Sequence, residues 1–343
     1  MISFRKGRIA AALGAIACAF ALPAQSQTTL TFSSWVPPTH HLTIWQVNWA
    51  ADVEKATAGR VKFQSLPKAP AAPPGTFDAV KDGLVDLSYV TASYTPARHV
   101  LPLMAELPGA GATAEINSVA YGRIYWKYFH KVGEYNGVKL LAVWTHGPGQ
   151  MFNTKRPIHS LADLHGMKIR TGGGIAEKFG NLLGASAFVK PAPESFELLN
   201  SGVADGVFFP LESVISFKLD TVLKYATLFP GGFYSSSFGF FMNQDKWNKL
   251  ANQDQDIIEK FGGEYAARSN GKSWDTADKA GLEGLQKAGV KIDHASPAFV
   301  KEVMAKAKIL DDDWIKSANA KGVDGAKVLA EFRAELKKVA AGK

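Results

Sequence analysis

The sequence holds a single cysteine among its 343 residues, and this residue, Cys18, lies inside an apolar run near the N-terminus. A lone cysteine cannot form a disulfide within the chain, so the fold must depend on a large hydrophobic core. After the first residues there is no cysteine left that could act as a nucleophile. No later stretch has 18 consecutive apolar residues, so no membrane-spanning helix is expected there.

The first 26 residues have the pattern of a secretory signal peptide. A basic region at residues 5–8 precedes an apolar run at residues 9–22, which is too short to span a bilayer comfortably. Cleavage is expected after Ala24 or Ser26. There is no twin arginine, which favours the general secretory route. The pattern predicts an exported protein.

Charge of either sign is not concentrated anywhere in the chain. The signal segment holds three of the 39 Lys and Arg residues and none of the 31 Asp and Glu residues, which leaves 36 against 31, an excess of +5. Basic residues are interspersed with acids, and the aromatic residues do not alternate with them, so no nucleic-acid partner is expected. The mild positive excess suits anionic ligands. About 317 residues remain, which suggests two domains.

Strand and helix patterns alternate along the chain in two similar series. The first series has strands near residues 30–33, 60–66 and 84–90, with helices near 40–58, where Thr39 is the expected cap, and near 76–83. The second series has strands near 167–170, 188–190 and 203–209, with helices near 175–183 and just before 202. A Pro/Ala-rich loop occurs in each series. We interpret the two series as related α/β lobes.

Two segments support this duplication. Residues 77–90 are FDAVKDGLVDLSYV and residues 196–209 are FELLNSGVADGVFF. In both, glycine follows an aromatic residue after six positions and aspartate follows it after nine. Two α/β lobes with a cleft between them suit capture of a ligand by hinge closure.

Motifs of the common enzyme classes are missing. There is no G-x-S-x-G elbow, P-loop or H-E-x-x-H sequence. His40 and His41 are adjacent, which suits a helix start better than a shared metal site. His146, in WTHGPGQ, is a loop histidine that is more often a hydrogen-bonding residue than a general base. We therefore expect no catalytic residue, metal or cofactor, and the alternative is a secreted two-domain enzyme acting on organic acids.

The segment GMKIRTGGG at residues 166–174 places Arg170 at the end of an expected strand, before a flexible turn and a helix. Such an arginine can hold an anion or be an ordinary surface residue. A dinucleotide-binding turn is disfavoured, because Glu177 occupies the position of its third glycine, where it would repel a pyrophosphate.

The chain resembles the solute-binding proteins of tripartite ATP-independent periplasmic (TRAP) transporters, the DctP family. The resemblance is carried by KRPIHSLADLHGMKIRTGGG at 155–174, LLGASAFVKPAPESFELLNSGVADG at 182–206 and FGFFMNQDKWNKL at 238–250. It implies a monomeric, two-lobed receptor in the periplasm that closes over an organic acid and delivers it to a sodium-driven membrane permease. A ligand sensor for a membrane signalling partner is a further alternative, since one fold can serve both roles.

The resemblance also implies a role for Arg170. The arginine that pairs with the substrate carboxylate in this family falls on Arg170, and a planar guanidinium can hold both carboxylate oxygens. Gly172 and Gly173 would let the backbone come close to the ligand. By resemblance, lobe I takes about 27–147 plus 237–275 and lobe II about 148–236 plus 276–343. The region 252–343 is largely helical in pattern.

Two departures from the sialic-acid receptors of the family bear on the ligand. Gln150 and Phe209 stand where those receptors carry a second arginine and an asparagine. An aromatic wall is expected instead. Its members are Trp35, Tyr94, Trp144, Phe208 and Phe209. We expect a monocarboxylate (a 2-oxo, 2-hydroxy or aromatic acid). A C4-dicarboxylate is the alternative if Gln150, His146 or the backbone binds a second carboxylate.

Overall fold

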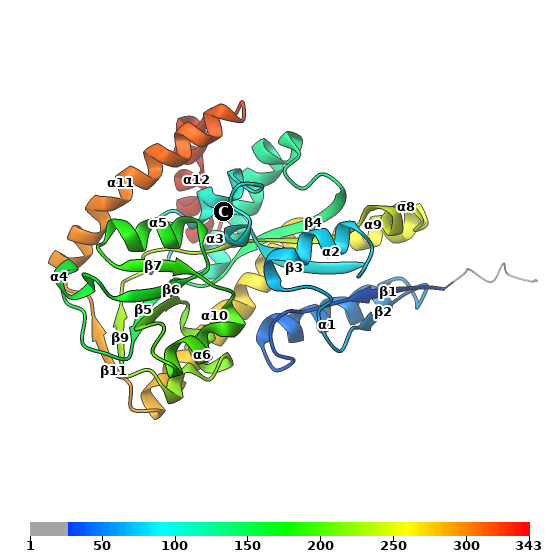
Figure 1. Ribbon diagram of the computed structural model, residues 1–343. Coiled ribbons are helices and arrows are strands. Elements are labelled where there is room, and N and C mark those ends of the chain that lie inside the picture. The colour runs from blue at the N-terminus through cyan, green and yellow to red at the C-terminus, as the bar shows by residue number, and fades with distance from the viewer. Residues whose placement is uncertain (1–26) are drawn as a thin grey trace, which may run out of the picture.

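The computed structural model describes residues 27–343, and the predicted signal peptide lies outside the described residues (Figure 1). Within residues 27–343, no helix combines the length and the apolar character needed to cross a membrane. The chain forms two β-sheets with helices packed around them. In Figure 1 the strands of one sheet lie among the green elements, and the other sheet begins with the blue and cyan strands.

The first sheet, sheet A, has five strands in the order β2-β1-β3-β10-β4. β1 is parallel to β2 and β3, whereas β10 is antiparallel to both of its neighbours. The strand bounds are Val61–Ser65 (β2), Thr28–Phe32 (β1), Leu87–Thr91 (β3), Ser237–Asn243 (β10) and Val138–Thr145 (β4). β10 is remote in sequence from the other strands, so sheet A is completed by a late segment of the chain.

The second sheet, sheet B, has six strands in the order β11-β9-β5-β8-β6-β7. Their bounds are Lys291–His294 (β11), Tyr225–Leu228 (β9), Gln150–Asn153 (β5), Gly206–Phe209 (β8), Lys168–Thr171 (β6) and Ser186–Val189 (β7). β5 is antiparallel to β8 and β9, and β6 is parallel to β7 and β8. Each sheet therefore contains one antiparallel strand among parallel ones.

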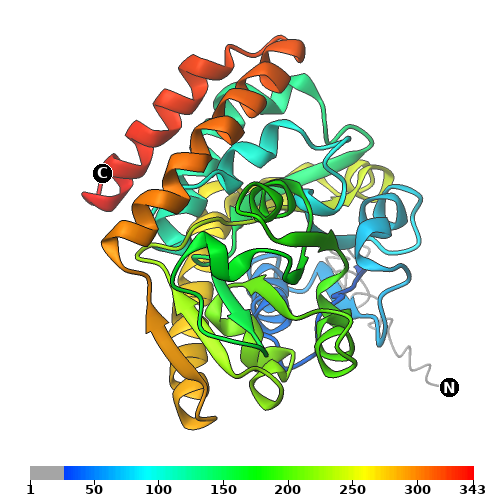
Figure 2. The ribbon, with the colours of Figure 1, turned by 60° about the vertical axis from the view of Figure 1, so that its left-hand side comes forward.

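Twelve α-helices lie in the described part of the chain. Their bounds are His41–Ala56 (α1), Thr76–Lys81 (α2), Ala114–Ile124 (α3), Leu161–Leu164 (α4), Gly174–Leu182 (α5), Ser195–Asn200 (α6), Leu211–Ser216 (α7), Gln244–Asn248 (α8), Asn252–Lys260 (α9), Gly263–Lys287 (α10), Pro297–Ala320 (α11) and Gly325–Ala340 (α12). Four of them and only one strand fall in 252–343, which confirms the helical C-terminal region. In Figure 2 the orange and red helices, α11 and α12, lie side by side.

Local sequence signals explain most element boundaries. Ser160 and Asp163 form a capping box at the start of α4, as the Ser-x-x-Asp spacing predicts. The expected cap of α1 was wrong by one residue, because the ring of His40, rather than Thr39, accepts the backbone N–H of Leu42. The two-sheet α/β architecture that the alternating pattern predicts is confirmed.

The core is aromatic on both faces of sheet A. Side chains alternate along β10, so Phe240 packs against Trp45 and Trp49, whereas Phe241 packs against Phe77 on the opposite face. All seven residues of β10 are buried. A strand that is covered on both faces has apolar residues at successive positions. This is why residues 238–242 of β10, FGFFM, do not alternate between apolar and polar side chains.

The chain crosses between the sheets three times. Residues 146–149 lead from β4 to β5, residues 229–236 lead from β9 back to β10, and α10 leads toward β11. The first two crossings pair with each other, since His146 N–H donates to Ser236 O at 3.1 Å and Gly149 N–H donates to Tyr234 O at 2.9 Å. A Cβ on residue 149 would lie 2.1 Å from the Tyr234 ring, so this contact requires glycine. The exact bounds of the two lobes stay a prediction.

The third crossing, α10, packs against α3 beside sheet A and against α7 beside sheet B. Two of its glycines permit these contacts. A Cβ at Gly271 would lie 2.5 Å from the Cα of Glu115, and one at Gly281 would lie 2.5 Å from Leu211 O. The helix thus holds both layers by direct backbone contact.

Candidate ligand site

A cavity lies between the sheets, near the carboxyl ends of β1, β3, β6 and β8. Open α/β sheets generally bind ligands at this edge, where loops of different strands meet. The cavity contains about 460 Å³ of atom-free space, part of it open to solvent. Its lining is mostly aromatic and apolar, with a few polar groups. The residues are Trp35, Val36, His40, Leu42, Thr91, Tyr94, His146, Arg170, Gly172, Ala192, Phe208, Phe209, Pro210, Ser213, Phe217, Tyr234, Ser236, Phe238 and Trp274.

Arg170 is the charged residue of this cavity, and only 1% of its surface is exposed. It stands in β6, where the pleat directs its side chain toward sheet A. Its Nε and Nη2 both donate to the carbonyl of Lys190, at 2.8 and 2.5 Å. This carbonyl fixes the plane of the guanidinium. One N–H of Nη1 and the second N–H of Nη2 form the end of the guanidinium, which matches the two oxygens of a carboxylate.

No carboxylate of residues 27–343 lies within 4.0 Å of the Arg170 guanidinium. All but one of the other described arginines have such a partner, and the exception, Arg156, is exposed. The Phe209 ring instead lies under its Cζ, at 4.5 Å from the ring centroid. Burial lowers the pKa of Arg170, an effect that the nearby Tyr94 and Tyr234 hydroxyls oppose. A buried guanidinium stays charged, and an uncompensated buried charge is strongly unfavourable. The buried charge of Arg170 therefore requires an anionic ligand to neutralise it.

Tyr94 adds a second donor beside Arg170. Its hydroxyl oxygen accepts the backbone N–H of Ala192 at 2.8 Å, which leaves the hydroxyl proton free to be donated. Burial raises the pKa of Tyr94, so the proton is retained. Trp35 packs edge-on against Tyr94 at 5.9 Å and donates its Nε1–H to Tyr89 O. Sheet A thus supplies a rigid donor opposite the arginine of sheet B.

Aromatic rings form the walls that extend away from Arg170. Phe209 is stacked on Phe217, with ring centroids 5.8 Å apart and an interplanar angle of 16°. Phe208 packs on Phe233 and Tyr234 behind the cavity. Flat apolar walls that start at a cationic group suit a planar apolar substituent next to a carboxylate.

His146 lines the cavity from the first crossing. Its Nδ1 lies 2.5 Å from the carbonyl of Gly147, and its ring packs edge-on against Tyr234 at 5.3 Å. Burial lowers the pKa of His146 to about 4, so the imidazole is neutral near pH 7.

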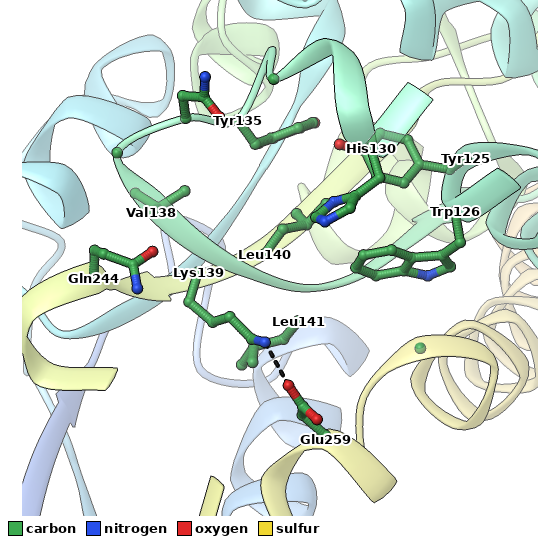
Figure 3. Close-up of a pocket in the computed structure, with 14 residues that line it drawn as sticks. Tyr125, Trp126, His130, Tyr135, Val138, Lys139, Leu140, Leu141, Gln244 and Glu259 are labelled. Carbon is green, nitrogen blue, oxygen red and sulfur yellow. Dashed lines mark hydrogen bonds and ion pairs between the residues drawn. The ribbon is translucent and has the colours of Figure 1, made fainter. Parts of the chain in front are cut away.

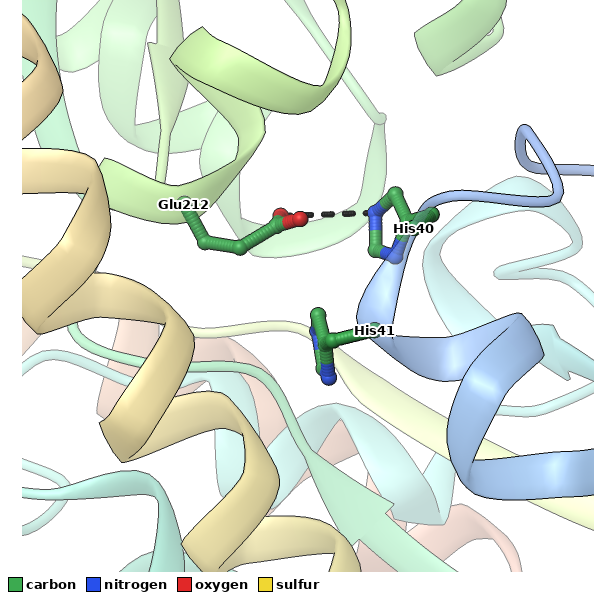
Figure 4. A group of neighbouring side chains, drawn as sticks. All are labelled: His40, His41 and Glu212. Atoms are coloured by element: carbon green, nitrogen blue, oxygen red, sulfur yellow. Dashed lines mark ion pairs between the residues drawn. The ribbon is translucent and has the colours of Figure 1, made fainter. Parts of the chain in front are cut away.

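His40, His41 and Glu212 gather at another border of the cavity (Figure 4). The Nδ1 of His40 accepts the Leu42 N–H at 3.2 Å, which places the ring proton on Nε2, and Nε2 donates to Glu212 Oε2 at 3.3 Å. Burial raises the pKa of Glu212 to about 7 and lowers that of His40 to about 3. A metal ligand must offer the Nε2 lone pair, so this tautomer favours a hydrogen-bonded pair over a metal centre.

Three residues expected in the site lie elsewhere. The amide of Gln150 accepts the N–H of Phe229 at 2.6 Å and donates to its carbonyl at 3.2 Å, so both its polar atoms serve sheet B. Trp144 is fully buried in the core between Trp45 and Phe238. Gly173 lies at φ +90°, and a Cβ there would lie 2.6 Å from Ser93 O, so this glycine serves a contact between the layers. The other seven expected residues line the cavity.

Several lining residues were missed by sequence reasoning. Tyr234 stands close to the expected lobe boundary between residues 236 and 237, and that position was the available signal. His40 was considered only as a helix start. Phe217 and Trp274 reach the cavity from α7 and α10, and no local pattern separates them from core aromatics.

A larger hollow lies beside the start of β4 and the π-helical turn Tyr125–Phe129 (Figure 3). Lys139 is its main cation, and it pairs with Glu259 at 2.5 Å while lying over the Trp247 ring at 4.4 Å. Its charge is therefore already neutralised by the protein. This hollow is a weaker candidate for an anion site than the cavity of Arg170.

Comparison with known proteins agrees with this geometry. The family model described as bacterial extracellular solute-binding protein, family 7 (DctP) matches residues 32–317. A crystal structure of a TRAP periplasmic solute-binding protein from Bordetella bronchiseptica with bound (R)- and (S)-mandelate is 44% identical, with a TM-score of 0.89, over 91% of this chain and 99% of that one. A marine-metagenome TRAP protein specific for aromatic acids, in complex with 3-hydroxybenzoate, is 31% identical, with a TM-score of 0.86, over 91% and 99%. The protein TsaT of Comamonas testosteroni, named an outer membrane transporter protein, is 32% identical over 97% of this chain and 98% of its own length.

Proposed function

The chain belongs to the bacterial extracellular solute-binding proteins of family 7, and from this premise we propose that it captures an aromatic monocarboxylic acid in the cavity around Arg170. The observation that carries the proposal is the buried guanidinium, which no carboxylate within residues 27–343 neutralises. A ligand carboxylate on its free edge would supply the missing charge. Each such charged hydrogen bond contributes about 1.5–3 kcal/mol.

The surroundings of Arg170 support an aromatic acid over a C4-dicarboxylate. Arg170 is the only lysine or arginine among the described residues that line the cavity. Gln150, the expected partner of a second carboxylate, is occupied by Phe229, and His146 is neutral. A second carboxylate would thus be buried without a counter-ion. The relatives with bound mandelate and 3-hydroxybenzoate point to the same ligand class.

The cellular role follows from the family. We propose that residues 1–26 direct export, that the mature receptor is a periplasmic monomer, and that it delivers its ligand to TRAP permease subunits. Solved relatives are periplasmic solute-binding proteins and not enzymes. An enzyme acting on organic acids would need a nucleophile or metal beside the bound acid. The described lining offers two histidines, of which His146 is neutral and His40 is paired with Glu212.

The test is calorimetric titration of the mature protein after unfolding and refolding, which removes any acid carried through purification. The ligands are mandelate, benzoate and succinate. We expect the aryl acids to bind the wild type more tightly than succinate. Arg170→Met should lose at least about 30-fold in affinity, because removing one partner of a buried charge pair costs about 2–5 kcal/mol.

The matched control is Arg156→Met. Arg156 is exposed and donates only to the carbonyl of Asp163, so its loss should leave every affinity unchanged. Tighter binding of succinate than of the aryl acids would overturn the ligand class. Retained binding by Arg170→Met would overturn the site.

A further inference from the structure

The two ring nitrogens of His146 differ in their remaining capacity for hydrogen bonds. Nδ1 faces the Gly147 carbonyl at 2.5 Å, and because a carbonyl only accepts, Nδ1 carries the proton. Nε2 of this neutral ring then holds a lone pair. Among residues 27–343, no hydrogen bond reaches Nε2, and the residue lines the cavity. Nε2 is therefore an acceptor without a donor.

The ring of His146 is held in place. It packs edge-on against Tyr234 at 5.3 Å and against Trp274 at 5.8 Å. Its backbone is fixed on both sides, since its N–H donates to Ser236 O and its carbonyl accepts the Ser235 hydroxyl at 3.0 Å. Such a ring cannot turn Nε2 away to find another partner. The ring that carries the acceptor is thus held in a fixed position on the border of the cavity.

The other polar groups of the cavity do not duplicate this acceptor. Arg170 and the Tyr94 hydroxyl proton are donors. His40 uses both ring nitrogens within the protein, for Leu42 N–H and Glu212. The hydroxyls of Thr91, Ser213, Tyr234 and Ser236 also line the cavity, and each can either donate or accept, so none of them discriminates between ligand groups. Among these side chains, His146 alone offers an atom that can only accept.

We propose that His146 is a specificity-determining residue that accepts a hydrogen bond from a hydroxyl group of the ligand, so that hydroxylated aryl acids bind more tightly than acids without a hydroxyl. This inference rests on the proposed function and assigns a second recognition element to the same cavity. A ligand without the hydroxyl leaves a buried acceptor unsatisfied, which lowers affinity roughly 5- to 100-fold. A 2-oxo acid turns carbonyl lone pairs toward Nε2 and gains nothing. The hydroxyl can come from the carbon next to the carboxylate or from the ring.

The experiment compares acids that differ by one oxygen. Phenylacetate carries no hydroxyl, mandelate carries it on the side chain, and 3- and 4-hydroxyphenylacetate carry it on the ring. Phenylglyoxylate has a carbonyl at the mandelate position. Dissociation constants are measured by calorimetry for the wild type and for His146→Phe, which keeps a flat ring between Tyr234 and Trp274 but removes the acceptor.

We expect at least one hydroxylated acid to bind the wild type roughly 5- to 100-fold more tightly than phenylacetate. In His146→Phe this ratio should fall to about one, while phenylacetate and phenylglyoxylate keep their affinity or gain. The hydroxylated acid that loses its advantage identifies the position of the hydroxyl. His146→Asn, whose amide oxygen also accepts, should restore part of the ratio.

His130→Phe is the control, because His130 is exposed beside the separate hollow of Figure 3. The inference is overturned if no hydroxylated acid is preferred by the wild type, or if the preference survives in His146→Phe. It is also overturned if His146→Phe weakens all acids equally, which would make His146 a packing residue. If the wild type binds none of these acids, the proposed function itself fails, so the two failures are distinct.

Discussion

Arg170 and the His40–Glu212 pair are two buried polar regions on the border of one cavity. They differ in whether the protein itself supplies the partners that their charges and hydrogen bonds require. Glu212 receives hydrogen bonds from His40 Nε2 and from the hydroxyls of Ser213 and Ser216. Arg170 donates to a carbonyl oxygen and lies over an aromatic ring, but no anionic group of residues 27–343 pairs with it.

The contrast indicates which region belongs to the ligand. A buried polar group that its own protein satisfies adds to the internal structure, whereas an incomplete one is unfavourable until something binds. Burial alone would have ranked the two regions equally. Their partners distinguish them, and the following substitutions test that distinction.

The largest effect is expected for Arg170→Lys. An ammonium cannot hold the Lys190 carbonyl and both carboxylate oxygens in one plane, so aryl acids should bind about 2–3 kcal/mol more weakly. Calorimetric dissociation constants provide the measurement. Wild-type affinity in this variant would mean that charge alone, without the fork of the guanidinium, holds the ligand.

Glu212→Ala should act on every acid alike. It leaves the His40 Nε2–H buried without an acceptor, which costs about 1–3 kcal/mol, and the pair joins the two layers rather than the ligand. Affinities for all aryl acids should fall by one common factor, with Glu212→Gln retaining most of the binding. A changed ranking of ligands would show that Glu212 contacts them directly.

Phe209→Leu should have a smaller effect. It removes the ring under the Arg170 guanidinium, an interaction that contributes about 0.5–2 kcal/mol. Phe217→Leu is the control, because Phe217 stacks on Phe209, and the cation–π contact of Arg170 is with Phe209. Isothermal titrations with benzoate should show the larger loss for Phe209→Leu, and equal losses would remove the cation–π contribution.

The smallest effect is a pH dependence of stability that the buried titratable groups produce. Burial raises the pKa of Asp278 to about 8 and of Glu212 and Glu106 to about 7, so their contribution is present at low pH and lost as pH rises through these values. Burial lowers the pKa of His40 to about 3 and of His146 to about 4, and that contribution is lost only below pH 6.5.

Between pH 6.5 and 8 the acids alone should act, and the unfolding free energy of the ligand-free protein should fall on the order of 1 kcal/mol per pH unit. Asp278→Asn should flatten this slope. Urea unfolding at the two pH values is the measurement. A rise in stability over this interval would contradict the assignment of neutral carboxyl groups.

Local patterns were sufficient for much of the fold. Helix periodicity and caps located α1, α2 and α5 within a few residues, and the similar order of elements in both halves predicted two α/β layers. Sequence could not pair β10 with β3 and β4, because the partners are more than 90 residues apart and both faces of β10 are apolar. Local patterns did not give the hydrogen bonds that join the crossings at residues 146–149 and 233–236; the lobe boundaries expected near them came from the resemblance alone.

The cavity was predicted where side-chain direction follows from strand position and missed where it depends on packing. Arg170, Phe208 and Phe209 stand at strand ends, and all three line the cavity. Trp144 is one residue from the end of β4, yet the pleat turns it into the core. Gln150 looked like a ligand donor because its partner, Phe229, is 79 residues away and invisible to any local pattern.

The glycine contacts of α10 have a consequence for motion. Gly271 touches α3 and Gly281 touches α7, and ten residues of helix separate these contacts by about 15 Å. A helix is stiff along its axis, so α10 keeps the distance between these two contacts nearly constant. Because the two contacts oppose sliding of the layers along α10, we expect ligand entry to use a swinging movement in which the mouth of the cavity opens more than its base.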